Sequence, residues 1–246
     1  MLKEESKSSL TEAFEQFFKL ELAVSDVQKK EVFRIRHRVY CEEFKYQSVD
    51  PSGNGLETDE FDSDSMHCLI THIRSNTPAG CVRLVPALEK VENGLLPLGK
   101  YCKSSLNQPL IDSMELDMSS VCEISRLAVD SKFRRRDGES LTRFGEINGL
   151  NVSDEERRSF SLIAIACFLA ATVMTEMNHR TNVFAMMEPF LPRLLHRSGI
   201  EFQRVGKDMN YHGIRAPYFI TTQSAIDNMH PDLLRLYHWI KLNIGK

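Results

Sequence analysis

The segment from Leu162 to Met174 is apolar on nearly every side when it is read as a helix. It runs for about 13 residues, whereas a helix that crosses a bilayer needs about 20. A helix without a polar face must be covered by other parts of the protein. The sequence therefore predicts a buried core helix and no membrane span.

The chain has 246 residues, 42% hydrophobic and 26% charged, which is enough to build one sizeable core. We predict a single domain over 1–246, with an N-terminal extension over 1–24 and a C-terminal helix within 222–246. The formal net charge is -3 with both signs interspersed, so nucleic acid is not an expected partner. The polar, acidic N-terminus lacks the pattern of a signal peptide, which favours a cytoplasmic location.

The six cysteines are scattered along the chain, mostly within apolar runs. They form no CxxC pair and show no metal-like spacing with histidine. Cysteines of this kind are typical of small buried hydrophobic residues in a reducing compartment. No metal site is predicted.

Helical and strand-like patterns follow one another along the chain. Ser25 and Gln28 have the spacing of a capping box, ahead of a helix predicted over 27–44. Runs over 66–73 and 79–88 flank the turn-forming SNTPAG and predict an antiparallel pair. Further strands are expected over 121–129, 182–187, 200–205 and 214–221, and helices over 158–179, 189–197 and 225–242. This order predicts an α/β fold, a three-layer α/β/α sandwich around one mixed sheet.

Polar residues interrupt these apolar elements in four places, the first being the predicted helix over 27–44. Arg36 and Tyr40 are four residues apart and share a helix face, and Tyr46 follows just past its end. An arginine beside aromatic rings can orient a carboxylate or a phosphate. A solvated face with snorkelling arginines is the alternative interpretation.

The second place is the acidic stretch ETDEFDSDS, and the third is the strand-like GCVRLVP. The acids, with Asp59 and Asp62 among them, can hold the ammonium group of a substrate or fix a loop together with an arginine. An exposed acidic loop is the alternative, and the spacing of an EF-hand is missing. Arg83 lies in the middle of an apolar strand and should pair with these acids, either as a structural salt bridge or as part of an active site.

The fourth place is CEISRLAV. On a strand, Glu123 and Ser125 point to one face and Arg126 to the other. A carboxylate beside a hydroxyl can relay a proton from an attacking amine, directly or through water. Acid and hydroxyl pairs also occur on solvated sheet faces, so the pattern alone is weak.

Together these four places resemble the autoinducer synthases, which make N-acylhomoserine lactones. That family carries an arginine with aromatics at +4 and +10, two acids three apart, a GxxRL strand and an E-x-SR strand. The matching residues are Arg36, Tyr40, Tyr46, Asp59, Asp62, Arg83, Glu123, Ser125 and Arg126. The resemblance implies a GNAT-like acyl-CoA N-acyltransferase fold, with the first six as substrate-binding residues and the last three as catalytic residues.

A closer resemblance is to the N-acyl amino acid synthase-like acyltransferases associated with PEP-CTERM/exosortase systems. The segments VYCEEFKY, ETDEFDSDSMHCLITH, EISRLAV, FRRRDGE, MEPFLPRLLHRSGI and YHGIRAPYF carry it. Tyr40 and Tyr46 stand where lactone synthases usually have Phe and Trp. The resemblance therefore implies an amino acid or similar amine as the acceptor, and makes use of S-adenosylmethionine doubtful.

The stretch LAVDSKFRRRDGES resembles the acetyltransferase motif in which a strand leads to a helix N-terminus that takes a pantetheine phosphate. It predicts contacts to the donor phosphate or to an acidic acyl carrier protein from Arg134, Arg135, Arg136, Gly138 and Ser140. A solvated basic turn is the alternative. The resemblance implies acyl carrier protein as the partner that supplies the acyl group, with acyl-CoA as the other possible donor and no tightly bound cofactor.

The expected reaction is aminolysis of a thioester, with Glu123 as the base, through water, and a β-bulge amide near Ser125 facing the oxyanion. Ser125 is a poor nucleophile here because no histidine lies in the motif. The predicted core helix over 161–174, with Met186 and Met187, could line an acyl tunnel, although core packing explains the same residues. Three alternatives stay open: a lactone synthase using S-adenosylmethionine, a non-catalytic carrier-protein binding module, and a small coenzyme A acetyltransferase.

Overall fold

The computed structural model describes residues 9–48, 53–88, 96–134 and 159–245, whose strands form one mixed sheet. The sheet order is β1-β2-β3-β4-β5-β8-β6, and β7 pairs with β8. The pairing of β4 with β5 is parallel, and the other described pairings are antiparallel. The strands are β1 (Phe18–Leu22), β2 (Met66–His72), β3 (Thr77–Pro86), β4 (Val121–Val129), β5 (Asn182–Met187), β6 (Gln203–Arg204), β7 (Met209–Asn210) and β8 (Ile214–Thr221).

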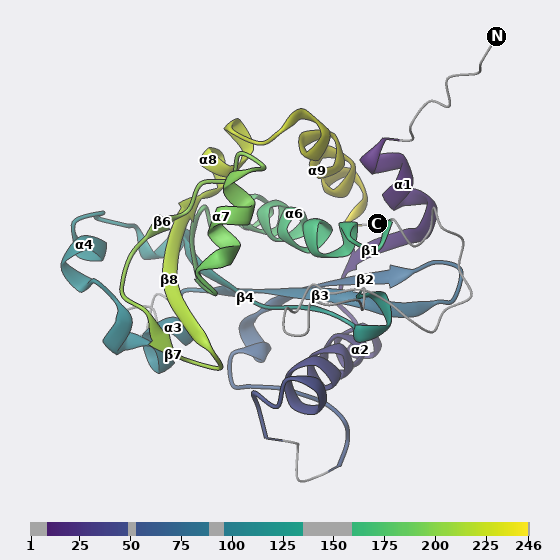
Figure 1. Ribbon diagram of the computed structural model, residues 1–246, viewed down its shortest axis with the longest axis horizontal. Coiled ribbons are helices and arrows are strands. Elements are labelled where there is room, and N and C mark those ends of the chain that lie inside the picture. Colours follow the sequence, from purple (N-terminus) through teal and green to yellow (C-terminus); the bar gives the residue numbers. More distant parts are fainter. Residues whose placement is uncertain (1–8, 49–52, 89–95, 135–158, 246) are drawn as a thin grey trace.

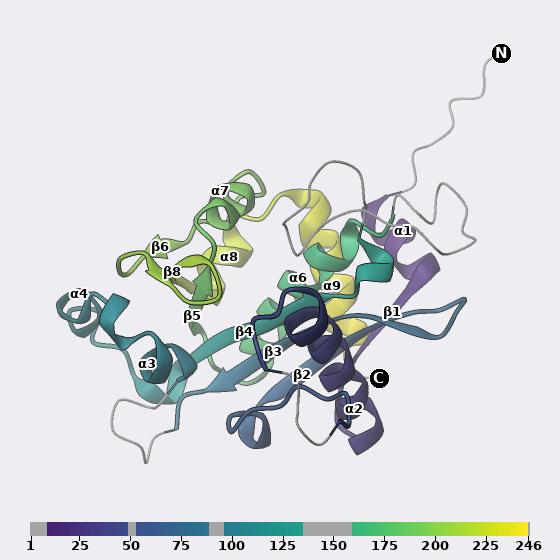
Figure 2. The same ribbon diagram turned by 60° about the horizontal axis from the view of Figure 1, so that its bottom comes forward.

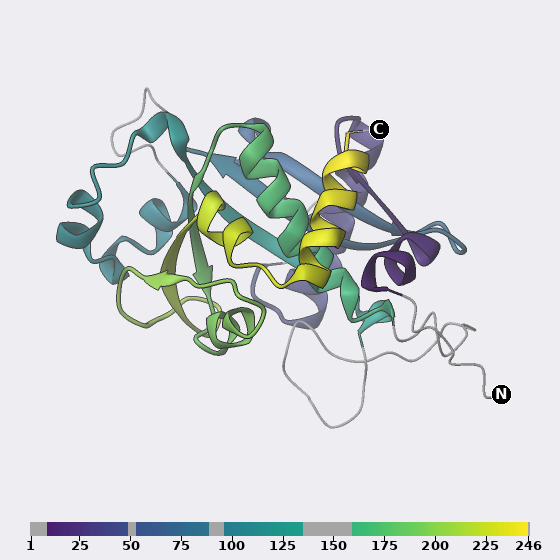
Figure 3. The same ribbon diagram turned by 90° about the horizontal axis from the view of Figure 1, so that it is seen from above.

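Helices cover both faces of this sheet (Figure 1). One face carries α2 (Asp26–Arg36), which continues as a π-helical segment, His37–Glu43. The other face carries α6 (Leu162–Met177), with α9 (Pro231–Asn243) beside it and α1 (Leu10–Phe17) against α9 (Figure 3). The predicted three-layer α/β/α architecture with one mixed sheet is confirmed. Shorter helices are α3 (Pro97–Tyr101), α4 (Gln108–Asp112), α7 (Phe190–His196) and α8 (Thr222–Asp227).

The helix that was predicted to be a core helix is α6. Ile163, Cys167 and Ala170 are fully buried against the sheet. The backbone at Gly80 on β3 approaches so closely that a Cβ there would lie 2.7 Å from the Ile163 Cγ2 atom. Small residues at this contact let helix and sheet pack tightly. Within the described ranges, no helix combines the length and the apolar character that a membrane span requires.

Other predictions are confirmed with shifted boundaries. The Ser25–Gln28 capping box begins α2, but regular α-helix ends at Arg36. The tail contains two helices, α8 and α9, where one over 225–242 was predicted, and only Gln203–Arg204 pairs within the strand predicted over 200–205. The N-terminal segment contributes α1 and the edge strand β1, neither of which the sequence pattern predicted.

The sheet opens between β4 and β5. Their register runs from Val121 opposite Asn182 to Glu123 opposite Phe184, after which both strands continue without pairing to each other. The group formed by β5, β8 and β6 turns away from the rest of the sheet (Figure 2). Strands that diverge in this way leave a cleft whose first residue on the β4 side is Glu123.

Candidate active site

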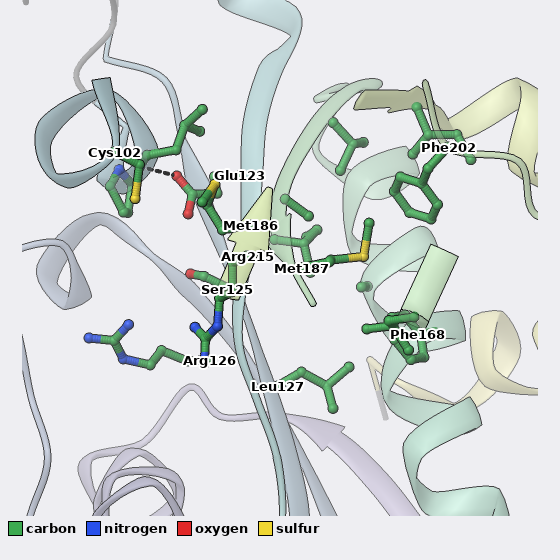
Figure 4. Close-up of a pocket in the computed structure, with 18 of the residues that line it drawn as sticks. Cys102, Glu123, Ser125, Arg126, Leu127, Phe168, Met186, Met187, Phe202 and Arg215 are labelled. Atoms are coloured by element: carbon green, nitrogen blue, oxygen red, sulfur yellow. Dashed lines mark hydrogen bonds between the residues drawn. The ribbon is translucent and has the colours of Figure 1, made fainter. Parts of the chain in front are cut away.

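A cavity lies in the cleft between β4 and β5, and it reaches α6 on the far side (Figure 4). Five consecutive residues of β4, from Glu123 to Leu127, line one wall. Met186 and Met187 of β5 and Phe168 of α6 line the opposite wall, where Phe202 also lies. The cavity therefore joins a polar wall to an apolar interior, which suits a reaction at the end of an apolar chain. Met186, Met187 and residues of α6, which were predicted as possible walls of an acyl tunnel, line this cavity, and their role as a tunnel stays a prediction.

Glu123 is the buried acid of this cavity, with 3% of its surface exposed. Its Oε2 atom accepts a hydrogen bond of 2.7 Å from the backbone N–H of Leu98 at the start of α3. Burial raises the pKa of Glu123 to about 7, against the lowering effect of the Leu98 N–H, Arg83 and Arg126. A carboxyl group with a pKa near neutrality is suited to general base catalysis at neutral pH.

Six charged residues form a closed ring of ion pairs on the α2 face of the sheet. Arg36 binds Asp62 through two hydrogen bonds, of 2.6 and 3.0 Å, and also binds Glu57. Arg126 joins Glu57 to Asp59 with donor–acceptor distances of 3.0 Å for both contacts. Arg83 closes the ring, with its Nη1 atom 2.6 Å from Asp59 and 2.7 Å from Asp62.

Each carboxylate of this ring contacts two arginines, so three negative and three positive charges balance in a buried place. Burial alone would raise the pKa of Asp62, but Arg36 and Arg83 hold that pKa well below its usual range. Burial also acts to raise the pKa of Asp59, but the hydrogen bond and the charge of Arg83, together with the charge of Arg126, lower it overall. Asp59 and Asp62 are therefore ionised at neutral pH, and their charges are fixed in position by the arginines.

The predicted pairing of Arg83 with the acidic stretch is confirmed. Arg83 also donates from Nε to the Ser125 Oγ atom at 3.1 Å, which connects the ring to the β4 wall of the cavity. Arg36 is fully buried behind this wall and does not line the cavity. Its donors are directed to Glu57 and Asp62, so in this structure it positions acids, and its predicted contact with a substrate stays a prediction.

The prediction that Arg126 points away from Glu123 and Ser125 is wrong. Cys81 pairs with Ala128 and Arg83 pairs with Ser125, so β4 has one more residue than β3 between these pairs. Arg126 lies in this bulge with φ of 51°, an unusual value for a residue with a side chain. The bulge turns Arg126 to the face that Ser125 occupies, and its two ion pairs stabilise the strained backbone.

Tyr40 and Tyr46, two of the predicted substrate-binding residues, both line the cavity. The Tyr40 hydroxyl donates a hydrogen bond of 2.7 Å to the Leu127 carbonyl, just past the bulge. The Arg126 guanidinium lies over the Tyr40 ring, 5.7 Å from its centroid. The π-helical segment thus places aromatic rings directly against the bulged part of β4.

Only part of the predicted donor-binding turn lies within the described residues. Arg134 is buried, pairs with Glu43 and lies over the Phe44 ring at 5.3 Å. It lines a second cavity, which also contains Phe168 and so adjoins the first. Arg135, Arg136, Gly138 and Ser140 lie outside the described residues. In the part of the chain that the structure describes, no cluster of histidine, cysteine or acidic side chains has the geometry of a metal site.

Sequence analysis missed several residues of the site. Glu57 was only one member of the acidic stretch, yet it bridges Arg36 and Arg126. Tyr211 and Arg215 line the cavity from the β7–β8 hairpin. The segment YHGIRAPYF contains both, and its glycine, aromatics and arginine were the available signal.

The comparisons with known proteins agree with this geometry. A model of the acetyltransferase (GNAT) domain matches residues 35–143, which include β2, β3 and β4. No curated protein sequence matches the chain. The match to the acetyltransferase (GNAT) domain, together with the cleft between β4 and β5, supports the predicted class of protein, an acyltransferase.

Several solved structures share the fold. The AHL synthase LasI is 15% identical with a TM-score of 0.58, over 87% of this chain and 96% of its own. The CoA-dependent acyl-homoserine lactone synthase MesI is 16% identical with a TM-score of 0.56, over 93% and 97%. FeeM, an N-acyl amino acid synthase from uncultured soil microbes, is 10% identical with a TM-score of 0.53, over 86% and 94%. The predicted GNAT-like fold is confirmed.

Proposed function

We propose that this protein transfers a fatty acyl group from a carrier-bound thioester to the amine of an amino acid or a similar small molecule. The observation that carries the proposal is the position of Glu123. Its carboxyl group lies buried where β4 and β5 separate, at the junction of a polar wall and an apolar cavity. A base at this junction is close to the reacting end of a chain held inside the cavity.

In the proposed reaction the amine nitrogen attacks the thioester carbonyl carbon, an amide C–N bond forms and the C–S bond breaks. The carboxylate of Glu123 accepts the proton that the nitrogen loses, directly or through water, and passes it on to the leaving thiolate, which restores the carboxylate. The bulge at Arg126 releases backbone amides from the regular ladder, and these could face the developing oxyanion. Ser125 and Arg126 connect the site to the ion-pair ring.

The proposed donor is an acyl carrier protein, with acyl-CoA as the alternative. Buried Arg134 and the cavity that it lines adjoin the acyl-chain cavity at Phe168. A pantetheine arm that enters there would bring its thioester towards the cleft. The CoA-dependent synthases among the similar structures make both donors worth testing, and titration with acyl-CoA and acyl carrier protein distinguishes them. The association with PEP-CTERM/exosortase systems and the cytoplasmic location stay predictions.

Organic extraction of an expressing host, followed by mass spectrometry, tests the proposed function. We expect acylated amino acids that are absent from a host carrying the empty vector and from one expressing Glu123→Gln. An N-acylhomoserine lactone in place of these products would support the alternative that the similarity to LasI and MesI favours. Absence of any new acylated amine would contradict both functions.

The reaction rate should depend on the ionisation of Glu123. Because burial raises its pKa to about 7, only the fraction that is deprotonated can act as a base. We expect kcat/KM to rise about tenfold per pH unit below pH 7 and to level off above it, until other groups titrate. Initial rates between pH 5.5 and pH 8.5 measure this profile. A rate that stays flat across pH 7 would argue against a role for this carboxylate.

A further inference from the structure

We propose that a cavity between α3, α4 and the beginning of β4 binds the side chain of the acceptor, which is then an amine that carries a large apolar group. This role rests on the proposed transfer of an acyl group to an amine. It adds a binding site outside the acid and arginine motifs. It also names the chemical class of the acceptor, an amine with an aliphatic or aromatic side chain.

This α3–α4 cavity is large and mainly apolar. Its volume is about 560 Å³. An apolar cavity of roughly 150 Å³ already accepts a benzene molecule. Lys103, Asp112 and Glu115 also line the cavity and are exposed, so the charged residues mark the side that opens to solvent. The apolar walls come from the segment between α3 and β4 and from β4 and β5, and include Leu98, Leu106, Ile111, Met118, Val121 and Phe184.

The sheet separates the α3–α4 cavity from the apolar interior of the acyl-chain cavity. Val121 and Phe184 belong to the apolar cluster around α3. Their chain neighbours Cys122 and Val183 belong to the cluster around α6, as alternation along a strand requires. Glu123 follows Val121 by two residues and pairs with Phe184, so its side chain lies on the face of the α3–α4 cavity.

Leu98 connects the α3–α4 cavity to the proposed base. It lines both this cavity and the acyl-chain cavity. Its backbone N–H also donates the hydrogen bond of 2.7 Å to the Glu123 carboxyl group. The α3–α4 cavity therefore begins within one residue of the group that would take the proton of the amine.

The proposed reaction joins two chains at one carbon atom, and each chain needs its own space. The acyl chain extends from the thioester carbonyl into the apolar interior beside α6. The amine must approach the carboxyl group of Glu123, which lies on the other face of the sheet. An apolar side chain on the amine would be buried in the α3–α4 cavity, and an amine without one would lose this favourable burial.

Gly99 provides a way to fill the α3–α4 cavity without strain. It lies in α3 and lines the cavity. A Cβ atom at Gly99 would have no heavy atom of the described residues within 4 Å, apart from its chain neighbours and its own helix backbone. A glycine with helical dihedral angles accepts a side chain without a change of backbone conformation. Gly99→Phe and Gly99→Leu should therefore occupy the space proposed for the acceptor.

The experiment measures kcat/KM for the free amino acids glycine, leucine and phenylalanine, with the full-length protein and one acyl donor. For the wild type we expect leucine and phenylalanine to exceed glycine by about 10- to 100-fold. Gly99→Phe should remove most of this preference, while kcat/KM for free glycine changes little. Gly99→Ala is the matched control, because a methyl group fills hardly any of the cavity, and it should keep the wild-type preference.

Two results would overturn the proposal directly: a wild-type protein that uses the three acceptors equally well, and a Gly99→Phe protein that keeps the wild-type preference. The preferred length of the acyl chain is a second readout, measured with short and long acyl donors and one acceptor. A change of this length in Gly99→Phe, with the acceptor preference unchanged, would assign the cavity to the donor instead. If Gly99→Phe does not fold, Gly99→Leu gives the same readouts with a smaller side chain.

Failure of this role and failure of the proposed function give different results. A protein that acylates amines without regard to their side chains overturns the role of the α3–α4 cavity alone. A protein that acylates no amine, with either acyl-CoA or acyl carrier protein as the donor, overturns the proposed function and the role of the cavity with it.

Discussion

Glu123→Gln should lower kcat about 10²- to 10⁴-fold while changing the KM of both substrates only a few-fold. Glutamine has nearly the same shape, and its side-chain oxygen can still accept the hydrogen bond from the Leu98 N–H. It cannot accept a proton at neutral pH. The substitution therefore removes the base and leaves the walls of the cavity unchanged.

The stability of this variant separates a chemical effect from a structural one. A carboxyl group whose pKa is raised from 4.5 to about 7 binds its proton more tightly in the folded state than in the unfolded state. Between these two pH values the wild type loses stability as the pH rises, and above pH 7 the ionised buried carboxylate is destabilising. Urea denaturation at pH 8 should find Glu123→Gln at least as stable as the wild type.

Glu15→Gln makes the same chemical change on the exposed side of α1, far along the chain from the cleft. It should leave both kcat and stability unchanged. Wild-type turnover in Glu123→Gln would exclude this residue as the base. A loss of turnover that is matched by a loss of folded protein would assign Glu123 a structural role instead.

Sequence patterns predicted the layers and the central strands because these depend on local periodicity. The apolar run 121–129 coincides with β4, and the all-round apolar segment became α6. The rule that a buried charge must be compensated within reach of its side chain was also enough to predict that Arg83 pairs with the acidic stretch. Local rules of this kind need no knowledge of distant segments.

The bulge at Arg126 could not be predicted in the same way. Simple alternation along a strand places Glu123 and Ser125 together and Arg126 opposite them, but β4 contains an additional residue between two pairs with β3. The bulged residues contact the π-helical segment His37–Glu43 and the acidic loop, which come from remote parts of the chain. The side on which Arg126 lies is therefore a property of the tertiary structure.

Arg215 was missed for a related reason. In the sequence it belongs to a segment that begins a late strand, more than 80 residues beyond Glu123. Only the divergence of β5 and β8 from β4 brings it to the same cavity. The first residues of a strand that follows a tight hairpin show no periodicity that would place one of them in a cavity wall.

Arg36→Met should destabilise the protein by about 3–5 kcal/mol, because it opens the ion-pair ring at a fully buried arginine. Methionine fills a similar length but leaves Glu57 and Asp62 each with one arginine of the ring in place of two. Each of these two buried carboxylates then lacks one of the two arginine charges that balance its own negative charge. Urea denaturation at pH 7 measures the loss as a change in the free energy of unfolding.

Arg34→Met is the matched control, since Arg34 lies in the same helix and pairs with Glu31 at the surface. Its loss should stay below about 1 kcal/mol. The lowered pKa of Asp62 adds a second test, because its contribution to stability is present above its ordinary pKa of 3.8 and fades as the pH falls further. The difference between wild type and Arg36→Met should therefore shrink below that pH. An Arg36→Met protein as stable as Arg34→Met at pH 7 would show that the ring does not stabilise the fold. The buried arginine would then contribute no more to the free energy of unfolding than the exposed one.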